Sequence, residues 1–341
     1  MKFLRKILFP FAVLYGLVTC IRNFLYNKGV LKATSFNVPV IAVGNLSVGG
    51  TGKSPQIEYL IRLLSPSYKV ATLSRGYKRQ SSGYILAKAG TNAKTIGDEP
   101  YQFFSKFPTV QVAVDANRKN GIEQLLALAA KPNVILLDDA YQHRKVKAGL
   151  YILLTAYGDL YTDDCMLPTG NLRELTAGAQ RASIIVVTKC PENLSIIEQE
   201  KIRTKLRLTS QQELFFTYIA YNSCIVSKSS KIKRETMQGE KKVLIAGIAK
   251  PDSFFNAIKQ EGDICLSYPD HHDFTEKEVV EIKKIAQNNK IITTEKDYVR
   301  LKEYFPEEQL FYLGIACSFI SGGENFNKTI LDYVGTSSRN G

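Results

Sequence analysis

The chain has 341 residues, enough for one large α/β domain with an appendage or for two domains. Its 45% hydrophobic residues can fill a globular core, and its 23% charged residues argue against a disordered chain. The formal net charge of +13 indicates a negatively charged partner: nucleic acid, anionic lipid or a polyphosphate substrate. The six cysteines include no C-x-x-C pair, so we expect reduced thiols without a zinc site or a disulfide framework.

The N-terminus combines basic residues with an apolar run. An uncharged, mostly apolar segment covers residues 7–21 between Arg5 and Arg22. It is shorter than the roughly 20 residues of a transmembrane helix, and a signal peptide or a buried core helix are the alternatives. The glycine-rich residues 49–54 that follow, Gly-Gly-Thr-Gly-Lys-Ser, are typical of a nucleotide-binding loop, whose ligand is cytosolic, and the basic flanks favour contact with lipid phosphates. Residues 1–30 are therefore predicted to form a membrane-associated hydrophobic helix.

Strand-like apolar runs alternate with helix-like stretches over the first half of the chain and beyond. The predicted strands lie at Val38–Val43, Lys69–Leu73, Val110–Val114, Val134–Leu137, Tyr151–Leu154 and Ile184–Val187. The predicted helices between them lie at Ser54–Leu64, Glu99–Phe107 and Asn117–Ala130. Such alternation predicts an α/β fold with a mostly parallel sheet and helices on both faces.

The pattern divides the chain at a polar, basic segment. Residues 227–242 are predicted to be a basic linker between a core over residues 31–226 and a smaller α/β subdomain over residues 243–334. The last residues, 335–341, are predicted to be a loose tail. The subdomain is indicated by further apolar runs at Val243–Ile248, Ile264–Leu266, Ile291–Thr293 and Leu310–Leu313.

A glycine-rich segment directly follows the first predicted strand of the core. It contains Gly49, Gly50, Thr51, Gly52, Lys53 and Ser54. Glycines let successive backbone N–H groups curl around phosphate oxygens, and the N-terminus of the next helix adds partial positive charge. In such loops the lysine reaches the β- and γ-phosphates and the hydroxyl ligates Mg²⁺. The strand–loop–helix context therefore predicts a core of the P-loop NTPase type that binds ATP with Mg²⁺.

An acidic pair, Asp138 and Asp139, ends the apolar run that starts at Val134. In phosphate-loop enzymes an Asp at a strand tip holds Mg²⁺ directly or through water. Strand tips at the carboxyl edge are also where ligands collect in such sheets. Ser54, Asp138 and Asp139 are therefore the predicted magnesium set, and which of the two aspartates touches the metal stays open.

Several motifs together resemble the tetraacyldisaccharide 4′-kinase family, the lipid A 4′-kinases. All three histidines of the chain lie in two acidic motifs, Asp138 to His143 and Asp270 to Asp273. The order and approximate spacing agree with the family over nearly the whole chain. The segments that carry the resemblance are residues 44–55, 74–77, 97–100, 115–118, 138–143, 167–174, 270–272 and 293–297. Ala140 and Tyr141 replace the usual Gly and Phe, and Ser54 replaces the usual threonine.

The resemblance implies a reaction and a setting. The γ-phosphoryl group of ATP would pass to the 4′-hydroxyl of an acylated glucosamine disaccharide 1-phosphate, giving lipid IVA. An acylated substrate stays in the membrane, so the implied partners are this lipid and the lipids of the bacterial inner membrane, met at its cytoplasmic face. No nucleic-acid partner and no obligate protein partner are expected.

The family pattern also implies roles for individual residues. Asp98 is the expected general base on the 4′-hydroxyl, with His271 as its partner; a helix N-cap is the alternative reading of Asp98. Arg118 and Arg173 are expected to neutralise transition-state charge or the sugar 1-phosphate. Further along, Gln142 and His143 are expected to orient the magnesium set or the nucleotide.

Two other classes of protein remain as alternatives at this point. A regulatory GTPase or partitioning-type ATPase also uses a glycine-rich loop before Lys-Ser, but such a protein has no need of the Asp98 and His271 motifs or of a hydrophobic N-terminus. A nucleic-acid-binding ATPase would suit the positive charge, yet no module that interleaves basic and aromatic residues is evident.

Overall fold

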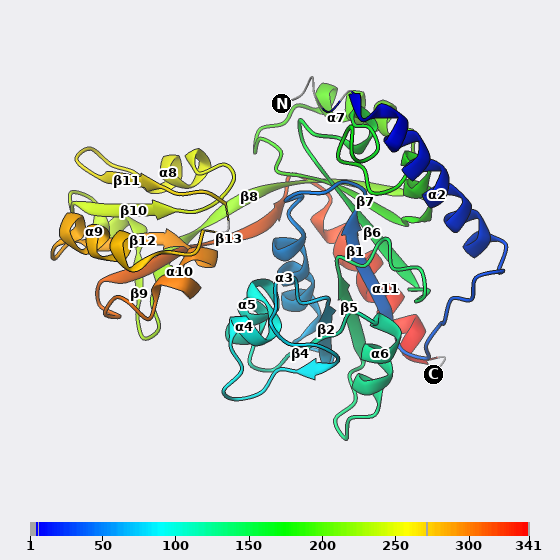
Figure 1. The fold of residues 1–341 in the computed structure, drawn as a ribbon, viewed down its shortest axis with the longest axis horizontal. Helices are drawn as coiled ribbons and strands as arrows, with labels where there is room; N and C mark the ends of the chain where they lie inside the picture. Colours follow the sequence, from blue (N-terminus) through cyan, green and yellow to red (C-terminus); the bar gives the residue numbers. More distant parts are fainter. Residues whose placement is uncertain (1–4, 6, 271, 340–341) are drawn as a thin grey trace. The chain divides into compact units, whose positions relative to one another are not determined.

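The computed structural model describes residue 5, residues 7–270 and residues 272–339 (Figure 1). The chain forms two compact units. The first contains residues 1–219 and 317–341, and the second contains residues 220–316. The boundaries fall inside two long strands, β8 (Glu213–Val226) and β13 (Leu310–Phe319), so the chain passes from one unit to the other in extended conformation.

The first unit is built on a mostly parallel sheet with strand order β8-β7-β6-β1-β5-β2-β4-β3. The pairings along this path are parallel, except that the short edge strand β3 pairs antiparallel with β4. Besides β8, the strands are β1 (Val40–Asn45), β2 (Val70–Ser74), β3 (Ile85–Leu86), β4 (Gln111–Val114), β5 (Val134–Asp138), β6 (Leu150–Ala156) and β7 (Ile184–Thr188). The alternation of apolar runs predicted these strands correctly, apart from β3 and β8.

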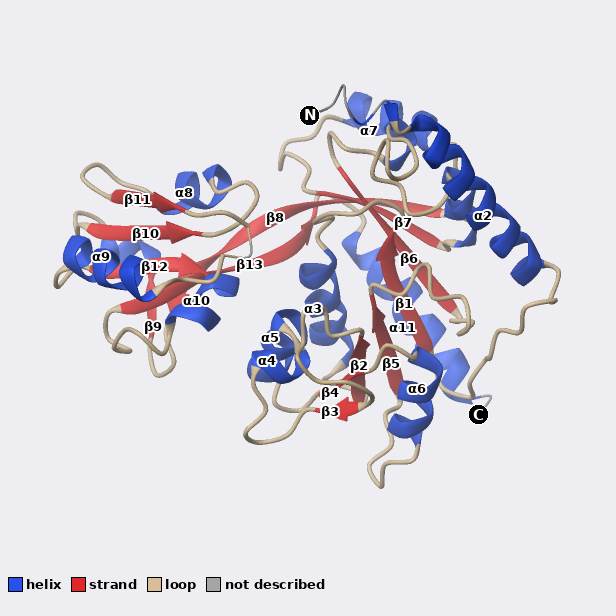
Figure 2. Cartoon of the chain, in the orientation of Figure 1, coloured by secondary structure: helices blue, strands red, loops and turns tan. Residues whose placement is uncertain are grey.

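Helices cover both faces of this sheet (Figure 2). Within β1, Ile41 packs into one core with α3, α5 and α11, whereas Ala42 packs into the opposite core with α6. Successive side chains of a strand point to opposite faces, so a strand buried on both faces reads as a continuous apolar run. The helices are α2 (Phe9–Asn27), α3 (Lys53–Leu64), α4 (Ala93–Ile96), α5 (Asp98–Lys106), α6 (Arg118–Leu126), α7 (Ile196–Leu206) and α11 (Gly323–Arg339), with 3₁₀ turns η1 (Tyr161–Asp163) and η2 (Thr176–Arg181).

The second unit has its own parallel strands and its own two cores, one on each face. Strands β10 (Lys242–Ala246), β11 (Ile264–Ser267) and β12 (Lys290–Thr294) join β13 in the order β11-β10-β12-β13. The helices of this unit are α8 (Asp252–Ile258), α9 (Glu276–Ala286) and α10 (Glu295–Leu301), with the 3₁₀ turn η3 (Arg234–Met237). The mostly parallel sheets with helices confirm the predicted α/β class.

The predicted domain boundaries differ from this division. The predicted core ended at residue 226 and the predicted subdomain ran over residues 243–334, whereas the second unit covers residues 220–316 and residues 317–334 belong to the first. Residues 227–242 are not a bare linker: a turn at 227–230 joins β8 to β9 (Lys231–Lys233), which pairs antiparallel with it. The exposed lysines of β9 made the segment look like a loop, although Ile232 between them is partly buried. The expected tail also begins inside α11, whose Phe326, Ile330 and Val334 recur at helical spacing and are buried in the first unit.

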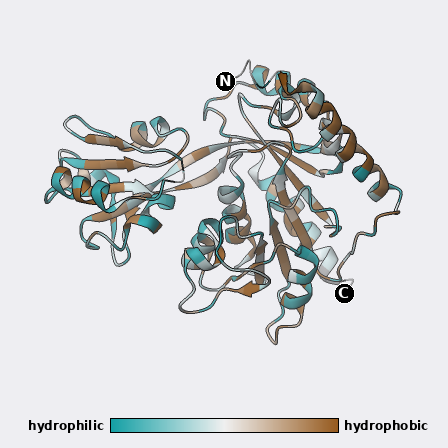
Figure 3. Cartoon of the chain, in the orientation of Figure 1, coloured by the Kyte–Doolittle hydropathy of each residue, from teal (hydrophilic) through white to brown (hydrophobic). Residues whose placement is uncertain are grey.

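Helix α2 carries the predicted apolar N-terminal segment. Among the described residues, it is the one helix long and apolar enough to cross a membrane by length and composition. Only 17% of its apolar window is buried, which argues against a core helix. Small side chains, Ala12, Gly16 and Thr19, are buried toward the protein, whereas large apolar ones remain exposed. The apolar character of the helix is evident along its length in Figure 3.

Candidate active site

The glycine-rich loop lies between the end of β1 at Asn45 and the start of α3 at Lys53. Gly49 and Gly52 have φ angles of 117° and 81°, where a residue with a Cβ is strained. Two residues at the end of the neighbouring strand β7 hold the loop by hydrogen bonds. The Thr188 hydroxyl donates to the carbonyl of Thr51 at 2.8 Å, and Lys189 Nζ donates to the carbonyl of Gly50 at 2.5 Å. The loop is therefore fixed in a shape whose amides suit a phosphate group.

The lysine and serine of the loop are held by polar groups. Lys53 Nζ donates to Asn45 Oδ1 at 3.3 Å and lies 3.7 Å from Asp139 Oδ1. The Ser54 hydroxyl donates to Glu99 Oε1 at 2.9 Å. Lys53 thus points toward the acidic pair, whereas Ser54 points toward Glu99 of α5.

Asp138 lies beside the loop because β5 pairs with β1 in parallel, with Val43 opposite Asp138. Its side chain is buried, and its Oδ1 finds no hydrogen-bond partner among the described residues. Burial, and then the nearby carboxylates of Glu99 and Asp139, raise the pKa of Asp138 to about 7.

Asp139 has a different environment. Burial opposes its charge, but the hydrogen bonds from Arg173 and the charge of Lys53 lower the pKa of Asp139 below its ordinary value. Arg173 makes a two-pronged pair with it, Nη1 to Oδ2 at 3.1 Å and Nη2 to Oδ1 at 2.8 Å. The structure therefore brings Arg173 into the site, as predicted, with its charge balanced by Asp139.

These residues fit a magnesium ion that binds together with ATP. Among the residues described, no group of three or more His, Cys, Asp or Glu side chains gathers as a metal site. Mg²⁺ does not need such a cage, since it usually binds one or two carboxylates plus substrate phosphates. The unpartnered Oδ1 of Asp138, the charged carboxylate of Asp139 and the hydroxyl of Ser54 are ligands of this kind. Sequence reasoning missed Glu99, whose carboxylate neighbours both Ser54 and Asp138.

The raised pKa of Asp138 predicts how stability depends on pH. Between about pH 4 and pH 7 the folded protein keeps a proton on Asp138 that the unfolded chain has released. The free energy of unfolding should therefore fall with rising pH in this window, by up to about 1.4 kcal/mol per pH unit. Asp138→Asn removes this penalty. The free energy of unfolding of the variant, relative to that of wild type, should therefore be higher at pH 8 than at pH 5. Urea denaturation of the nucleotide-free proteins at the two pH values measures this.

Asp139→Asn is the matched control, because its carboxylate is stabilised by Arg173 and Lys53. It should be less stable than wild type at both pH 5 and pH 8. An equal response of the two variants to pH would contradict the assignment of the proton to Asp138.

Arg118 contacts the backbone of the acidic pair. Its guanidinium is buried and donates to the backbone carbonyls of Asp115 at 2.6 Å and Asp138 at 3.3 Å. Burial lowers the pKa of Arg118 to about 10, and the neighbouring Asp138 works against this shift. In this structure the side chain holds the end of β5 in place, and its role in neutralising transition-state charge stays a prediction.

Gln142 and His143 follow the acidic pair and differ in their surroundings. Gln142 Nε2 donates to the carbonyl of Asn45 at 2.9 Å and to Glu174 Oε1 at 2.9 Å, so it contacts the strand that leads into the phosphate loop. His143 Nε2 is buried and meets no hydrogen-bond partner in the described part of the chain. Burial, followed by the charge of Arg118, lowers the pKa of His143 to about 4, so its imidazole is neutral at physiological pH.

The structure describes one member of the expected catalytic pair, Asp98. Asp98 is the first residue of α5, and Gly97, with φ 94°, occupies the N-cap position. The alternative interpretation of Asp98 as a helix N-cap is therefore wrong by one position, although a carboxylate in the first turn still complements the helix dipole. His271 lies outside the described residues, so its pairing with Asp98 stays a prediction.

The chain matches a known family over nearly its whole length. The model of the tetraacyldisaccharide-1-P 4′-kinase family covers residues 4–335. The chain belongs to this family. A regulatory or partitioning-type nucleotidase is not favoured, because the match extends through the phosphate loop and the entire second unit.

Relatives and a solved structure agree with this membership. Tetraacyldisaccharide 4′-kinase of Flavobacterium johnsoniae is 63% identical over 98% of this chain and 98% of its own length. The kinase of the same name from Flavobacterium psychrophilum is 58% identical over the full length of both chains. The crystal structure of LpxK from Aquifex aeolicus, in complex with ATP, superposes with a TM-score of 0.77 at 32% identity and covers 97% of this chain and 99% of that one.

Proposed function

We propose that the protein is an ATP-dependent kinase that phosphorylates the 4′-hydroxyl of a tetraacylated glucosamine disaccharide 1-phosphate, the step that gives lipid IVA in lipid A biosynthesis. The observation that carries the proposal is the fixed phosphate loop with Lys53 beside the Asp138–Asp139 strand end, in a chain that the kinase family matches from residue 4 to residue 335. Relatives of 63% and 58% identity bear the name of this kinase.

The chemistry follows from positioning and charge. The oxygen of the 4′-hydroxyl attacks the γ-phosphorus, the bond to the β–γ bridging oxygen breaks, ADP leaves, and Asp98 accepts the hydroxyl proton. Lys53 and the amides of residues 49–52 bind the β- and γ-phosphates. Arg173, already at the strand end, balances charge that develops on the transferred group. A bound magnesium ion, held by Ser54 and the acidic pair, would supply further charge neutralisation on the phosphates.

Labelled ATP tests the proposal. Purified enzyme, ATP carrying ³²P in its γ-phosphate and the purified disaccharide lipid are incubated in detergent, and lipids are separated by thin-layer chromatography. Label should migrate with a new, more polar lipid. Release of labelled inorganic phosphate alone, with no labelled lipid, would point to a nucleotidase instead.

We further infer that α2 places the enzyme on the cytoplasmic leaflet of the inner membrane, where ATP is present. Its exposed apolar side chains include Phe11 (63%), Leu14 (59%) and Val18 (57%). Burial of such a face in the interfacial region, together with the basic net charge, favours association with an anionic bilayer. The helix is held against the protein by polar contacts, which supports an orientation along the membrane surface.

Replacing the exposed face tests this placement. The triple variant Phe11→Ser, Leu14→Ser and Val18→Ser should move most of the protein from the membrane fraction to the soluble fraction. It should raise the KM for the lipid substrate at least tenfold, since losing the burial of even one large apolar side chain, worth about 1.5–3 kcal/mol, corresponds to about tenfold or more. The KM for ATP should stay within about twofold.

The matched control replaces Ile196 and Ile197 of α7 by serine. These side chains are 77% and 71% exposed, so the control removes comparable apolar surface elsewhere in the first unit. Equal release from the membrane by the control and the triple variant would contradict a specific role for α2.

A further inference from the structure

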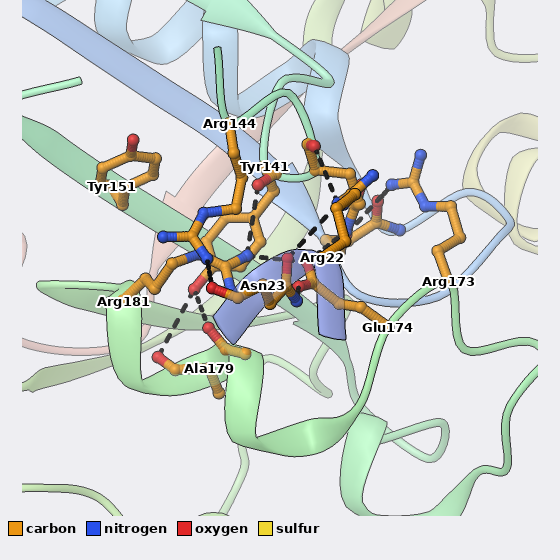
Figure 4. Close-up of polar contacts among 12 residues, drawn as sticks. Arg22, Asn23, Tyr141, Arg144, Tyr151, Arg173, Glu174, Ala179 and Arg181 are labelled. Atoms are coloured by element: carbon orange, nitrogen blue, oxygen red, sulfur yellow. Dashed lines mark hydrogen bonds and ion pairs between the residues drawn. The ribbon is translucent and has the colours of Figure 1, made fainter. Parts of the chain in front are cut away.

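Helix α2 is joined to the loops of the active site by its polar side chains (Figure 4). Tyr15 donates to the carbonyl of Arg173 at 3.0 Å, and Arg22 donates to the carbonyl of Gln142 at 3.2 Å. In the reverse direction, Arg144 donates to the carbonyl of Asn23 at 2.9 Å. The helix therefore contacts the loop of Gln142 and His143 and the loop of Arg173.

Glu174 is the centre of these contacts. Its carboxylate is fully buried and pairs with Arg181 Nη2 at 2.8 Å. The same oxygen, Oε1, accepts Gln142 Nε2 at 2.9 Å, and Oε2 accepts Nδ2 of Asn23 at 2.8 Å. One buried charge thus connects a side chain of α2 with a side chain of the loop after β5. A buried charge with partners on several segments fixes their relative geometry, because losing one partner leaves a costly unpaired group.

The contacts continue to the phosphate loop through Asn45. The carbonyl of Asn45 accepts Gln142 Nε2 at 2.9 Å and Arg173 Nη2 at 3.0 Å. Its side-chain oxygen accepts Lys53 Nζ at 3.3 Å. A continuous series of hydrogen bonds therefore runs from α2, through Glu174 and Gln142, to the residue that holds the phosphate-binding lysine.

We propose that Asn23 and Glu174 are positioning residues that couple the docking of α2 on the loops of Gln142 and Arg173 to nucleotide binding. The proposal rests on the proposed function, since it concerns the same ATP site. Engagement of α2 by a bilayer would favour the docked helix and thereby the arrangement of Asn45 and Lys53 that binds ATP. Coupling of this kind is reciprocal, so bound nucleotide would favour membrane engagement to the same degree. The enzyme would then bind ATP most tightly where its lipid substrate is found.

Asn23 is the best position for the test. It is half-buried, so Asn23→Ala should fold, whereas Glu174→Ala leaves Arg181 without its counter-charge. Glu174→Gln is a second probe, because an amide cannot accept hydrogen bonds at both of its ends and so must lose either Asn23 or its other donors.

The experiment measures binding of a non-hydrolysable ATP analogue with Mg²⁺ by calorimetry, without lipid substrate, in detergent and on phosphatidylglycerol-containing vesicles. Wild type should bind more tightly on vesicles. Asn23→Ala should weaken binding about 3- to 10-fold and lose the vesicle effect, and Glu174→Gln should weaken it at least as much. Gln142→Ala completes a double-mutant cycle with Asn23→Ala. The affinity of the double variant for the analogue should lie within about twofold of that of the single variant that binds more weakly, because both changes interrupt the same series of contacts.

Lys328→Ala, which removes only an exposed ion pair with Asp332 on α11, is the matched control and should not change the affinity for the analogue in detergent or on vesicles. Unchanged affinity in Asn23→Ala, or additive losses in the double variant, would overturn the coupling. If wild type bound no nucleotide at all, the proposed function would fail as well, so the two failures are distinguishable.

Discussion

Replacing Lys53 by alanine is expected to lower phosphoryl transfer by roughly 10²-fold or more while the protein stays folded. The side chain starts α3, where its ammonium lies between Asn45 and Asp139 and faces the glycine-rich loop. Removing a charge that stabilises the transition state costs about this much in other enzymes. Initial rates in a detergent–lipid assay with labelled ATP measure the loss.

Lys119→Ala is a suitable control for this result. Lys119 is an exposed lysine of α6 that makes only a 3.6 Å pair with Glu123 one turn away, so its loss should leave the rate unchanged. Near-normal turnover by Lys53→Ala would remove the phosphate loop from the proposed mechanism.

Asp98→Ala is expected to lower kcat by roughly 10²- to 10⁴-fold and to leave nucleotide affinity mostly intact. The reason is that Asp98 is assigned to the substrate proton and to neither phosphate nor metal. His271→Ala should lower kcat by a smaller factor. If the two groups act as one unit, the double variant should be little worse than Asp98→Ala alone.

His272 provides an internal control in the same segment. Its Nε2 lies 2.9 Å from Glu278 Oε1, and its ring stacks on Tyr268 with centroids 5.0 Å apart. These contacts assign it to the packing of the second unit, so His272→Ala should lower kcat less than His271→Ala. Additive losses for Asp98 and His271, or a larger loss from His272, would show that the pair is wrong, and Asp139 would be the next candidate base.

Local patterns predicted much of the fold and the centre of the site. Apolar runs identified β1, β5 and most other strands because a strand covered on both faces must be apolar throughout. Lys53 and Asp138 were identifiable because a phosphate loop and a strand-end aspartate are short motifs with fixed context. Parallel pairing of β1 with β5 then explains why residues far apart in sequence meet at one edge.

Other features depend on contacts that no local pattern contains. Glu174 lies in one of the motifs that resemble the family, but its burial against Arg181 and Asn23 follows from the packing of α2 on distant loops. Asn45 closes β1, and its part in holding Lys53 requires the return of the chain at Arg173. The division into units was also misplaced, because β8 and β13 each continue through a boundary, at residues 219–220 and 316–317, where the sequence indicated no break.

The position of the new phosphate is the most direct test of the account. The lipid product made from the tetraacylated disaccharide 1-phosphate by the wild-type enzyme can be purified and examined by ³¹P-detected NMR correlated to the sugar protons. The account predicts two phosphomonoesters, the original one at position 1 and a new one coupled to the proton at position 4′, and roughly 10²-fold less of this product from Lys53→Ala in the same time. A new phosphate on any other hydroxyl, or a diphosphate at position 1, would contradict it.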